Sequence, residues 1–309
     1  MQRAVLIAGP TTSGKTDISL RLARQVGGWV INADSMQIYR DLRVVTARPT
    51  EAQRAGIPHR LFGTVDGSEA FSAAQYAAAA GRAIAAADAA GAVPILVGGT
   101  GFYFTALTEG LADIPPIPAA VRQTVRQVLA THGSERLHAT LAIEDPAAAG
   151  RLAPGDSQRI ARALEVVRGT GRPLDAWQAD HRPGPLAGRP LVRAVLTLPR
   201  DALRARIDRR FRAMVEQGAL EEVAALQARH LDPSLPVMKA LGVPPLIEHL
   251  ASRLDLETAI ARAVTQTRQY AKRQDTWFRN RFDDWPRYDP RCPDETVAAL
   301  LAHLHGDTR

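Results

Sequence analysis

The chain has 309 residues, 46% of them hydrophobic and 23% charged, which excludes collagen-like and wholly disordered proteins and allows a large core. The single cysteine, Cys292, excludes an internal disulfide bond, and no apolar run is long enough for a signal peptide or a membrane span, so we expect a cytoplasmic protein. The formal net charge of +7 favours a polyanionic partner.

The N-terminal part of the chain alternates short apolar runs with amphipathic or alanine-rich segments. Short buried strands that alternate with helices indicate a parallel sheet covered on both faces. In chain order, the predicted elements are a strand at 4–8, a helix at 15–26, strands at 30–31 and 60–65, a helix at 72–90 and a strand at 93–97.

This pattern changes at residues 113–118, where three prolines in four positions end an element. The next segment contains no strand candidate, and a strand reappears only near residue 191. The predicted elements of this half are helices over 119–177, a strand at 191–198, and helices at 201–230 and 256–275. We therefore predict an α/β protein in which residues 1–113 and 190–309 form the core and residues 114–189 form a helical insertion domain.

Residues 9–16 match the phosphate-binding pattern G-x-x-x-x-G-K-[ST] in full. The segment follows a predicted strand and opens a predicted helix, so backbone amides and the helix N-terminus point at phosphate oxygens. The core is therefore predicted to be a P-loop NTPase-like parallel sheet. Lys15 adds a positive charge, and the Thr16 hydroxyl is a ligand suited to Mg²⁺, the expected cofactor. The predicted phosphate-binding residues are Gly9, Pro10, Thr11, Thr12, Ser13, Gly14, Lys15 and Thr16.

A P-loop alone does not identify the reaction. A kinase or NTPase needs an acidic residue for Mg²⁺ at the end of another strand, and Asp34 is the nearest candidate. The other obvious strand end, residues 98–103, carries no carboxylate. Asp34 could bind the metal, cap a helix, or act as a general base that takes a proton from a nucleophile.

Five segments resemble, in this order and at these spacings, the tRNA dimethylallyltransferases, also called isopentenyltransferases. The segments are GPTTSGKT (9–16), ADSMQIY (33–39), GGTGFY (98–103), DSQRIARALEV (156–166) and TRQYAKRQDTWFR (267–279). The resemblance implies a P-loop that binds the diphosphate of dimethylallyl diphosphate instead of ATP. It also implies transfer of the five-carbon group to the N6 amine of adenosine 37, beside the anticodon, in tRNAs that read codons beginning with U, with release of diphosphate.

The resemblance also implies roles for individual residues. Asp34 would be the general base, and Arg210 would bind the departing diphosphate together with Lys15 and Thr16, because positive groups stabilise the charge that develops there. The reacting adenine must be turned out of the anticodon loop into a pocket. By resemblance, the residues that hold it would be Asp34, Ser35, Met36, Gln37 and Thr100.

Two basic segments suit an RNA backbone. Residues 151–172 carry a net charge of +3 and residues 266–281 a net charge of +4. Aromatic residues are interleaved with the second segment, and of these we expect Phe278 to pack in the core rather than stack on bases. Further tRNA contacts are predicted for Arg122, Gln158, Arg159, Ile160, Ala161, Arg162, Lys239, Arg268, Lys272 and Arg273.

One segment departs from the family pattern. Residues 239–245 lack the Gly-Tyr pair and the following basic residue that family members commonly carry, so only Lys239 stays as a candidate contact there. The expected partners are the tRNA anticodon stem-loop and dimethylallyl diphosphate. No membrane and no protein partner is required, because one copy carries every predicted catalytic part.

Three alternatives remain open from the residues. The protein could be a small-molecule P-loop kinase, or an RNA-binding protein with an unused P-loop. It could also transfer a prenyl group to free adenine nucleotides, although the helical insertion and the basic segment at 266–281 argue against that activity. Labelled prenyl diphosphate or labelled ATP, offered together with tRNA, would separate these alternatives.

Overall fold

A computed structural model describes residues 3–306 and divides the chain into two compact units. One unit contains the residues up to Thr108 and from Pro185 onward, and the other is Glu109–Gly184. The boundaries expected from the sequence, 114 and 189, each lie five residues further along the chain. The prolines at 115–118 mark the start of the long helices, whereas the chain has left the first unit several residues earlier.

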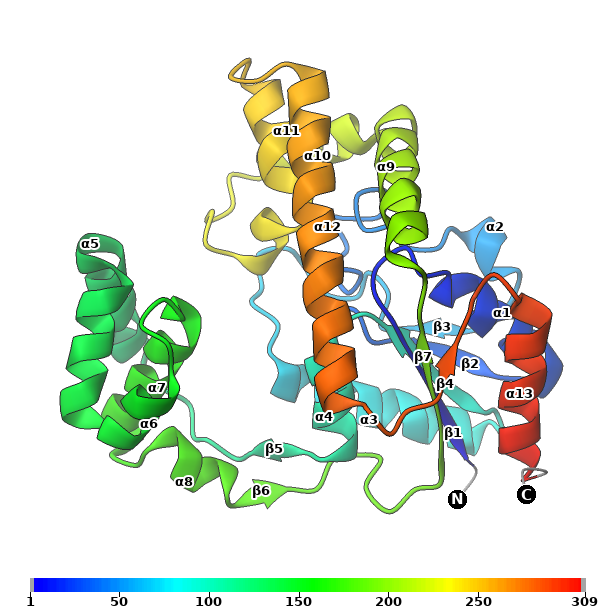
Figure 1. Cartoon of the computed structure of the whole chain (residues 1–309), viewed down its shortest axis with the longest axis horizontal. Helices are drawn as coiled ribbons and strands as arrows, with labels where there is room; N and C mark the ends of the chain where they lie inside the picture. Colours follow the sequence, from blue (N-terminus) through cyan, green and yellow to red (C-terminus); the bar gives the residue numbers. More distant parts are fainter. Residues whose placement is uncertain (1–2, 307–309) are drawn as a thin grey trace. The chain divides into compact units, whose positions relative to one another are not determined.

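The first unit is built on a six-stranded parallel sheet with the order β3-β2-β4-β1-β7-β8 (Figure 1), as the predicted fold class requires. The central strands β1 and β4 are buried along their whole length, which explains their uninterrupted apolar sequences. The strands are β1 Ala4–Ala8, β2 Trp29–Asn32, β3 His59–Arg60, β4 Pro94–Gly98, β7 Leu191–Leu196 and β8 Arg287–Tyr288.

Helices cover both faces of this sheet, and alternate strand residues point to opposite sides. On one side, Val5 and Ile7 of β1 pack with residues of α1 (Lys15–Val26) and α13 (Pro293–His305). On the other side, Leu6 packs with residues of α3 (Ala73–Ala89) and α4 (Gly101–Thr108). The sheet is thus held between two helical layers, and the loops at the carboxyl ends of its strands carry the P-loop and the segment after β2.

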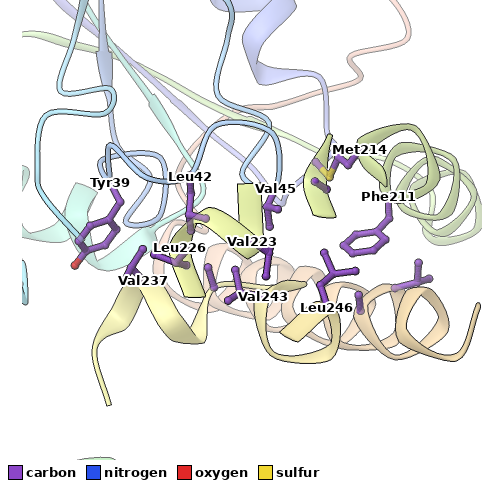
Figure 2. Packing of buried hydrophobic residues seen from close by; sticks show 14 of the residues in the cluster. Tyr39, Leu42, Val45, Phe211, Met214, Val223, Leu226, Val237, Val243 and Leu246 are labelled. Atoms are coloured by element: carbon purple, nitrogen blue, oxygen red, sulfur yellow. The ribbon is translucent and has the colours of Figure 1, made fainter. Parts of the chain in front are cut away.

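A third hydrophobic cluster of this unit joins the segment after β2 to four α-helices and one short 3₁₀ helix, η1. Tyr39, Leu42 and Val45 pack against Phe211 and Met214 and against residues of the neighbouring helices (Figure 2). This packing fixes the chain directly after Asp34 against the helical part of the unit. The elements concerned are α9 Arg200–Glu216, α10 Ala219–Gln227, η1 Pro236–Lys239, α11 Val243–Leu250 and α12 Leu256–Arg281.

The second unit is mainly helical, with a small core of its own. Val125, Leu137 and Leu141 of its first helix pack against Ile160 and Leu164. A short antiparallel pair, β5 with β6, was not predicted, because two-residue strands leave no periodic signal. The elements are β5 Leu111–Ala112, α5 Ala119–Glu144, α6 Pro146–Arg151, α7 Ser157–Thr170, α8 Leu174–Gln178 and β6 His181–Arg182.

Several sequence-based boundaries are corrected by the structure. The strand expected at 60–65 stops at Arg60, because Leu61 and Gly63 have φ angles of 63° and 65°, which leave the extended region. The helix expected at 201–230 is divided at Gly218, whose φ is 98°. The short helix α2 (Glu51–Arg54), together with α4, α11, α13 and β8, was not predicted. No helix within residues 3–306 is long and apolar enough to cross a membrane.

Candidate active site

The P-loop joins β1 to α1, and its lysine is folded into the loop. Lys15 Nζ donates hydrogen bonds to the carbonyl oxygens of Gly9, at 2.9 Å, and Pro10, at 2.6 Å. Gly14 has a φ of 87°, and a Cβ atom there would lie 3.3 Å from the Cβ of Pro290. A glycine at this position therefore suits both the left-handed turn and the close approach of the loop after β8.

Two charged side chains, Asp34 and Arg210, act on the charge of Lys15. Burial lowers the pKa of Lys15 to about 7, while the carboxylate of Asp34 raises that pKa and the guanidinium of Arg210 lowers it. Burial likewise lowers the pKa of Arg210 to about 10, against the opposing effect of Asp34. The two cations and the carboxylate thus belong to one electrostatic group.

Arg210 reaches the P-loop from α9. Its Nη2 atom donates a 2.6 Å hydrogen bond to Thr11 Oγ1. The segment that carries it contains six arginines, and four of them, Arg200, Arg204, Arg209 and Arg212, are exposed. Arg206, which lies three residues before Arg209 and four before Arg210, lines the same cavity as these two residues. Their clustering makes this side of the P-loop strongly positive.

Asp34 is held in place by the end of β2. The side-chain oxygen of Asn32 accepts the Asp34 N–H, and the Asn32 amide donates to the carbonyl oxygens of Asp34 and Leu61. Asp34 Oδ1 accepts the N–H groups of Met36, at 2.9 Å, and Gln37, at 3.3 Å. Across the described part of the chain no protein group hydrogen-bonds to Oδ2, so one oxygen caps the turn and the other is left available to a ligand.

Gln37 is oriented by the loop that follows it. Its Nε2 donates to the carbonyl oxygens of Thr46, at 2.9 Å, and Ala47, at 3.3 Å. Since both partners are acceptors, the amide nitrogen must face them, and Oε1 remains as the group that can contact a ligand. The Gln37 amide can therefore accept a hydrogen bond from an adenine edge, whereas its donor is occupied within the protein.

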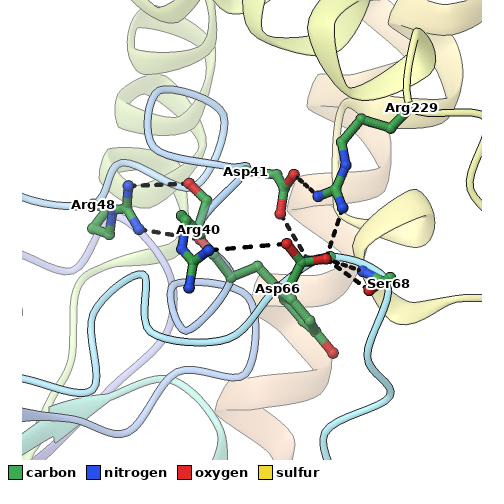
Figure 3. Close-up of polar contacts among 8 residues, drawn as sticks. Arg40, Asp41, Arg48, Asp66, Ser68 and Arg229 are labelled. Carbon is green, nitrogen blue, oxygen red and sulfur yellow. Dashed lines mark hydrogen bonds and ion pairs between the residues drawn. The ribbon is translucent and has the colours of Figure 1, made fainter.

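The loop between Tyr39 and Arg48 is held by side chains from several directions. Glu222 of α10 accepts the backbone N–H groups of Arg43, Val44 and Val45 at 2.6–2.9 Å. Figure 3 shows the other contacts of this loop region. These are hydrogen bonds from Arg229 to Asp41 and Asp66, and from Arg48 to the carbonyl oxygens of Tyr39 and Arg40. The sequence offered no signal for Glu222, because its partners are backbone groups distant in the chain.

Thr100 links the loop after β4 to the segment after β2. Its Oγ1 accepts the Ser35 N–H at 3.0 Å and lies 3.3 Å from the Ser35 hydroxyl. The Thr100 side chain also hydrogen-bonds the phenol of Tyr270, whose pKa burial raises above its usual value. The neighbouring glycines are explained by packing. A Cβ on Gly98 would lie 2.0 Å from the Ala33 carbonyl oxygen, and one on Gly101 would lie 2.1 Å from Trp277 Nε1.

Gln274 of α12 joins the P-loop to the loop after β4 and was not predicted as a site residue. Its Oε1 accepts the Thr11 N–H at 2.8 Å, and its Nε2 donates to the Gly99 carbonyl oxygen at 2.7 Å. Only 5% of this residue is exposed. A glutamine on the same helix face as Ala271 and Phe278, which are both buried, is a signal that the sequence contained.

Two cavities meet beside the P-loop, at Asp34 and Arg210. The larger has a volume of about 560 Å³. Its wall includes P-loop residues, basic side chains of α9, and the apolar residues Val30, Phe62 and Val97. The smaller, of about 250 Å³, has Ser35, Met36, Phe211, Met214, Lys239, Tyr270 and Arg273 in its wall. The residues that line both cavities are Thr11, Asp34, Thr46 and Arg210.

The outer face of α12 carries the basic residues predicted to contact RNA. Arg268, Lys272 and Arg273 are exposed, and Arg273 lies over the Tyr270 ring with 5.7 Å between its Cζ and the ring centroid. Lys239 is exposed at the smaller cavity. Phe278 is buried, which confirms its expected place in the core.

In the helical unit, two of the residues predicted to contact tRNA have buried side chains. The side chains of Ile160 and Ala161 pack in the core of this unit, because they occupy the inward positions of α7, and are therefore not available to RNA. Arg122, Gln158 and Arg159 are exposed, and Arg162 is partly exposed. Three of the arginines counted in the +3 segment are engaged internally, Arg151 with Asp175, Arg168 with Glu144 and Arg172 with the Trp177 ring.

A preassembled metal site does not occur among the described residues, because no three histidine, cysteine, aspartate or glutamate side chains are grouped to hold an ion. The oxygen groups that line the larger cavity beside the P-loop include the Thr16 hydroxyl and the Asp34 carboxylate. Mg²⁺ commonly binds to one or two protein oxygens together with phosphate oxygens of a substrate. These residues therefore fit a magnesium ion that binds along with a diphosphate.

Several known proteins are similar to this chain in sequence and in fold. The sequence model of the IPP transferase family matches residues 37–281. A tRNA dimethylallyltransferase of Methylobacterium sp. (strain 4-46) is 57% identical over 278 residues, which cover 90% of this chain and 91% of the relative. The crystal structure of the full-length tRNA isopentenylpyrophosphate transferase from Bacillus halodurans has a TM-score of 0.69 at 32% identity and covers 99% of this chain and 98% of that one. A eukaryotic dimethylallyltransferase described as acting on tRNA has a TM-score of 0.77 at 30% identity, over 90% of this chain and 70% of its own.

Proposed function

The chain belongs to the IPP transferase family of tRNA dimethylallyltransferases, and from this premise we propose how its residues transfer a dimethylallyl group to N6 of adenosine 37 in tRNA. The observation that carries the assignment of roles is the meeting of two cavities at Asp34 and Arg210. A group-transfer enzyme with two substrates needs such a junction, because the donor and the acceptor must approach one point from different sides.

The larger cavity suits the prenyl donor. The amides of the P-loop, Lys15 and Arg210 lie on the part that would receive the diphosphate, and Val30, Phe62 and Val97 offer an apolar wall for the five-carbon tail. Arg206 and Arg209 add positive charge to the same cavity. The P-loop in this proposal binds an allylic diphosphate and has no need of a purine pocket.

A magnesium ion would be held by the Thr16 hydroxyl and the diphosphate oxygens. The hydroxyl fits this role because it faces the larger cavity and, among the described residues, makes no hydrogen bond to another protein group. When bound, the ion neutralises part of the charge of the diphosphate. Lys15 and Arg210 supply the remaining positive charge from the protein.

The smaller cavity suits the adenine. Ser35, Met36 and Tyr270 would bound the flipped base, with Thr100 holding Ser35 in place. Lys239 and Arg273, at the same cavity, are positioned for RNA phosphates, and Arg268 and Lys272 extend this basic surface along α12. In the helical unit, Arg122, Gln158, Arg159 and Arg162 are the candidate contacts to the anticodon stem-loop. Restriction to tRNAs that read codons beginning with U follows from the family resemblance alone.

In the proposed reaction the N6 nitrogen attacks the first carbon of the prenyl group. The new N–C bond forms as the C–O bond to diphosphate breaks, and the N6 proton passes to Asp34 Oδ2, the carboxylate oxygen that accepts no hydrogen bond from the described residues. Gln37 Oε1 is available to accept the second N–H of the amine. The negative charge that develops on the leaving diphosphate is received by Lys15, Arg210 and the P-loop amides.

A label-transfer experiment tests this function. The protein is incubated with Mg²⁺ and unmodified tRNA, together with dimethylallyl diphosphate labelled in the five-carbon group or ATP labelled in its γ-phosphate. We expect the carbon label to enter tRNA and the phosphate label to be transferred to nothing. Phosphate transfer from ATP at a comparable rate would instead identify a P-loop kinase.

A further inference from the structure

Gln274 connects the helix that carries the basic RNA-facing residues to the donor site. It lies on the inner face of α12, whereas Lys272 and Arg273 lie on the exposed face. Its two hydrogen bonds reach residues 263 and 175 positions away in the sequence, Thr11 in the P-loop and Gly99 after β4. A buried amide with both ends bonded to distant loops constrains those loops more than it constrains its own helix.

The chemistry of its partners fixes the amide in one orientation. Thr11 presents an N–H donor and Gly99 presents a carbonyl acceptor, so Oε1 must face the first and Nε2 the second. Space is also restricted, since a Cβ atom on Gly99 would lie 2.2 Å from Gln274 Nε2. The close approach of glycine backbone to the amide allows this geometry.

The hydrogen bond between Gln274 and Thr11 reduces the number of P-loop N–H groups that can bind a diphosphate. Because Gln274 accepts the Thr11 N–H, that amide is not available to a phosphate oxygen. The Thr11 hydroxyl, in turn, accepts the hydrogen bond from Arg210 Nη2. Three residues from α12, the P-loop and α9 therefore form one chain of contacts that ends at the guanidinium facing both cavities.

We propose that Gln274 is a positioning residue of the donor site, which holds Thr11 so that its hydroxyl sets the place of the Arg210 guanidinium. The inference rests on the proposed function in one respect, namely that Arg210 receives the diphosphate. Thr267, another buried polar residue of α12, bonds the carbonyl oxygen of Ala263 in its own helix. Gln274 differs because its bonds leave the helix, so its removal acts on the loops.

The test measures binding of dimethylallyl diphosphate, with Mg²⁺ and without tRNA, by titration calorimetry. Gln274→Met keeps the length of the side chain and removes both hydrogen bonds, to the Thr11 N–H and to the Gly99 carbonyl oxygen. We expect affinity to fall at least about tenfold, because Thr11, and with it the Arg210 guanidinium, is no longer held in the place that receives the diphosphate. Turnover measurements should show a raised KM for dimethylallyl diphosphate, with the KM for tRNA changed less than about twofold.

Variants of Thr11 test the route of the effect. Thr11→Val removes the hydroxyl bonded to Arg210 and should weaken diphosphate binding, whereas Thr11→Ser should retain it. If Gln274 acts through Thr11, the double variant with Gln274→Met and Thr11→Val should bind no more weakly than the weaker single variant. Gln227→Met, an exposed glutamine at the end of α10, is the control and should bind as the unaltered protein does.

Three results would overturn the inference. One is a folded Gln274→Met protein, with a lowered melting temperature, that binds the diphosphate within twofold of the unaltered protein. Another is a fully additive double variant. Should Gln274→Met fail to fold, unchanged affinity of Thr11→Val would refute the contact chain. A failed function proposal is distinguishable, because the unaltered protein would then bind the diphosphate and transfer no prenyl group to tRNA.

Discussion

Asp34 divides two tasks between its two carboxylate oxygens. Oδ1 caps the turn at Met36 and Gln37, and Oδ2 makes no hydrogen bond to any described protein group in a residue that lines both cavities. Of the alternatives that the sequence left open, capping and catalysis are therefore compatible. An asparagine would keep an oxygen for the turn and lose the ability to take a proton.

This division predicts the behaviour of Asp34→Asn. We expect single-turnover transfer to fall by about 10²-fold or more, because a positioned general base contributes on that order. Affinity for tRNA, measured by filter binding, should change less than about threefold. A transfer rate within threefold of the unaltered protein would show that Asp34 is not the base. Asp17→Asn, an exposed carboxylate on α1, is the matched control and should have no effect.

Lys15 gives the donor site a pH dependence. Burial lowers its pKa to about 7 in the free protein, and a bound diphosphate would raise that pKa by adding negative charge nearby. A group whose pKa rises on binding takes up a proton, so affinity is full below pH 7 and declines as pH increases above it. Calorimetric titrations at pH 8 in buffers of different ionisation enthalpy should show proton uptake. Binding without proton exchange, and equal affinity at pH 6.5 and pH 8.5, would contradict the prediction.

At the scale of elements, the structure shows how a loop without secondary structure becomes part of the site. The segment after Tyr39 reaches both cavities through Thr46, and its carbonyl oxygens hold the Gln37 amide. Glu222 accepts three successive N–H groups of this segment. The loop is thus ordered by α10 as well as by its own packing in Figure 2.

Glu222→Gln is expected to loosen this loop. The amide keeps one acceptor oxygen, so the variant loses charge-assisted bonds, and the free energy of unfolding should fall by about 1–3 kcal/mol. The transfer rate should fall as well, because the carbonyl groups that orient Gln37 move with the loop. Urea denaturation and transfer assays measure the two effects. Glu221→Gln, an exposed neighbour on α10, should leave both unchanged, and equal losses in the two variants would contradict the role given to Glu222.

Elements with strong local signals could be predicted from the sequence. The strand, P-loop and helix over residues 4–26 combine an apolar run, a complete motif and helical spacing, and the structure confirms their bounds. A parallel sheet also follows from the alternation of elements, whereas β8, its sixth strand, is too short to leave a pattern. For the site, the sequence placed Lys15, Asp34 and Arg210 in one group. The helical spacing marks Gln274 as a buried position, but its partners and those of Glu222 are backbone groups that only the tertiary fold brings near, so the roles of these two residues could not be predicted.

At the scale of the whole molecule, not every arginine contributes to a basic surface. Arg168 forms two-pronged hydrogen bonds with Glu144, at 2.6–3.2 Å, and therefore has less charge to offer to RNA. Lys272 is exposed on α12 and has no ion pair within the described residues. A count of charges along the sequence gives each of these residues one positive charge. In the fold, Arg168 is paired with a carboxylate, and Lys272 is not paired with any described residue.

The salt dependence of tRNA binding should reflect this difference. We expect affinity to fall by roughly 10²-fold or more between 50 and 200 mM salt, because several phosphate contacts release counterions. Lys272→Gln should reduce the slope of log affinity against log salt by about one, and Arg168→Gln, the control, should leave it unchanged. Affinities determined by filter binding over a salt series test both statements. A flat salt response of the unaltered protein would refute an electrostatic RNA surface.

The acceptor atom is the most direct test of the whole account. The unaltered protein is incubated with Mg²⁺, dimethylallyl diphosphate and an unmodified anticodon stem-loop, and the RNA is then digested to nucleosides and analysed by mass spectrometry. We expect one five-carbon group, on N6 of adenosine 37, and no product with a stem-loop that carries guanosine at that position. A prenyl group on another nucleotide, or efficient prenylation of free adenosine monophosphate in place of the stem-loop, would contradict it.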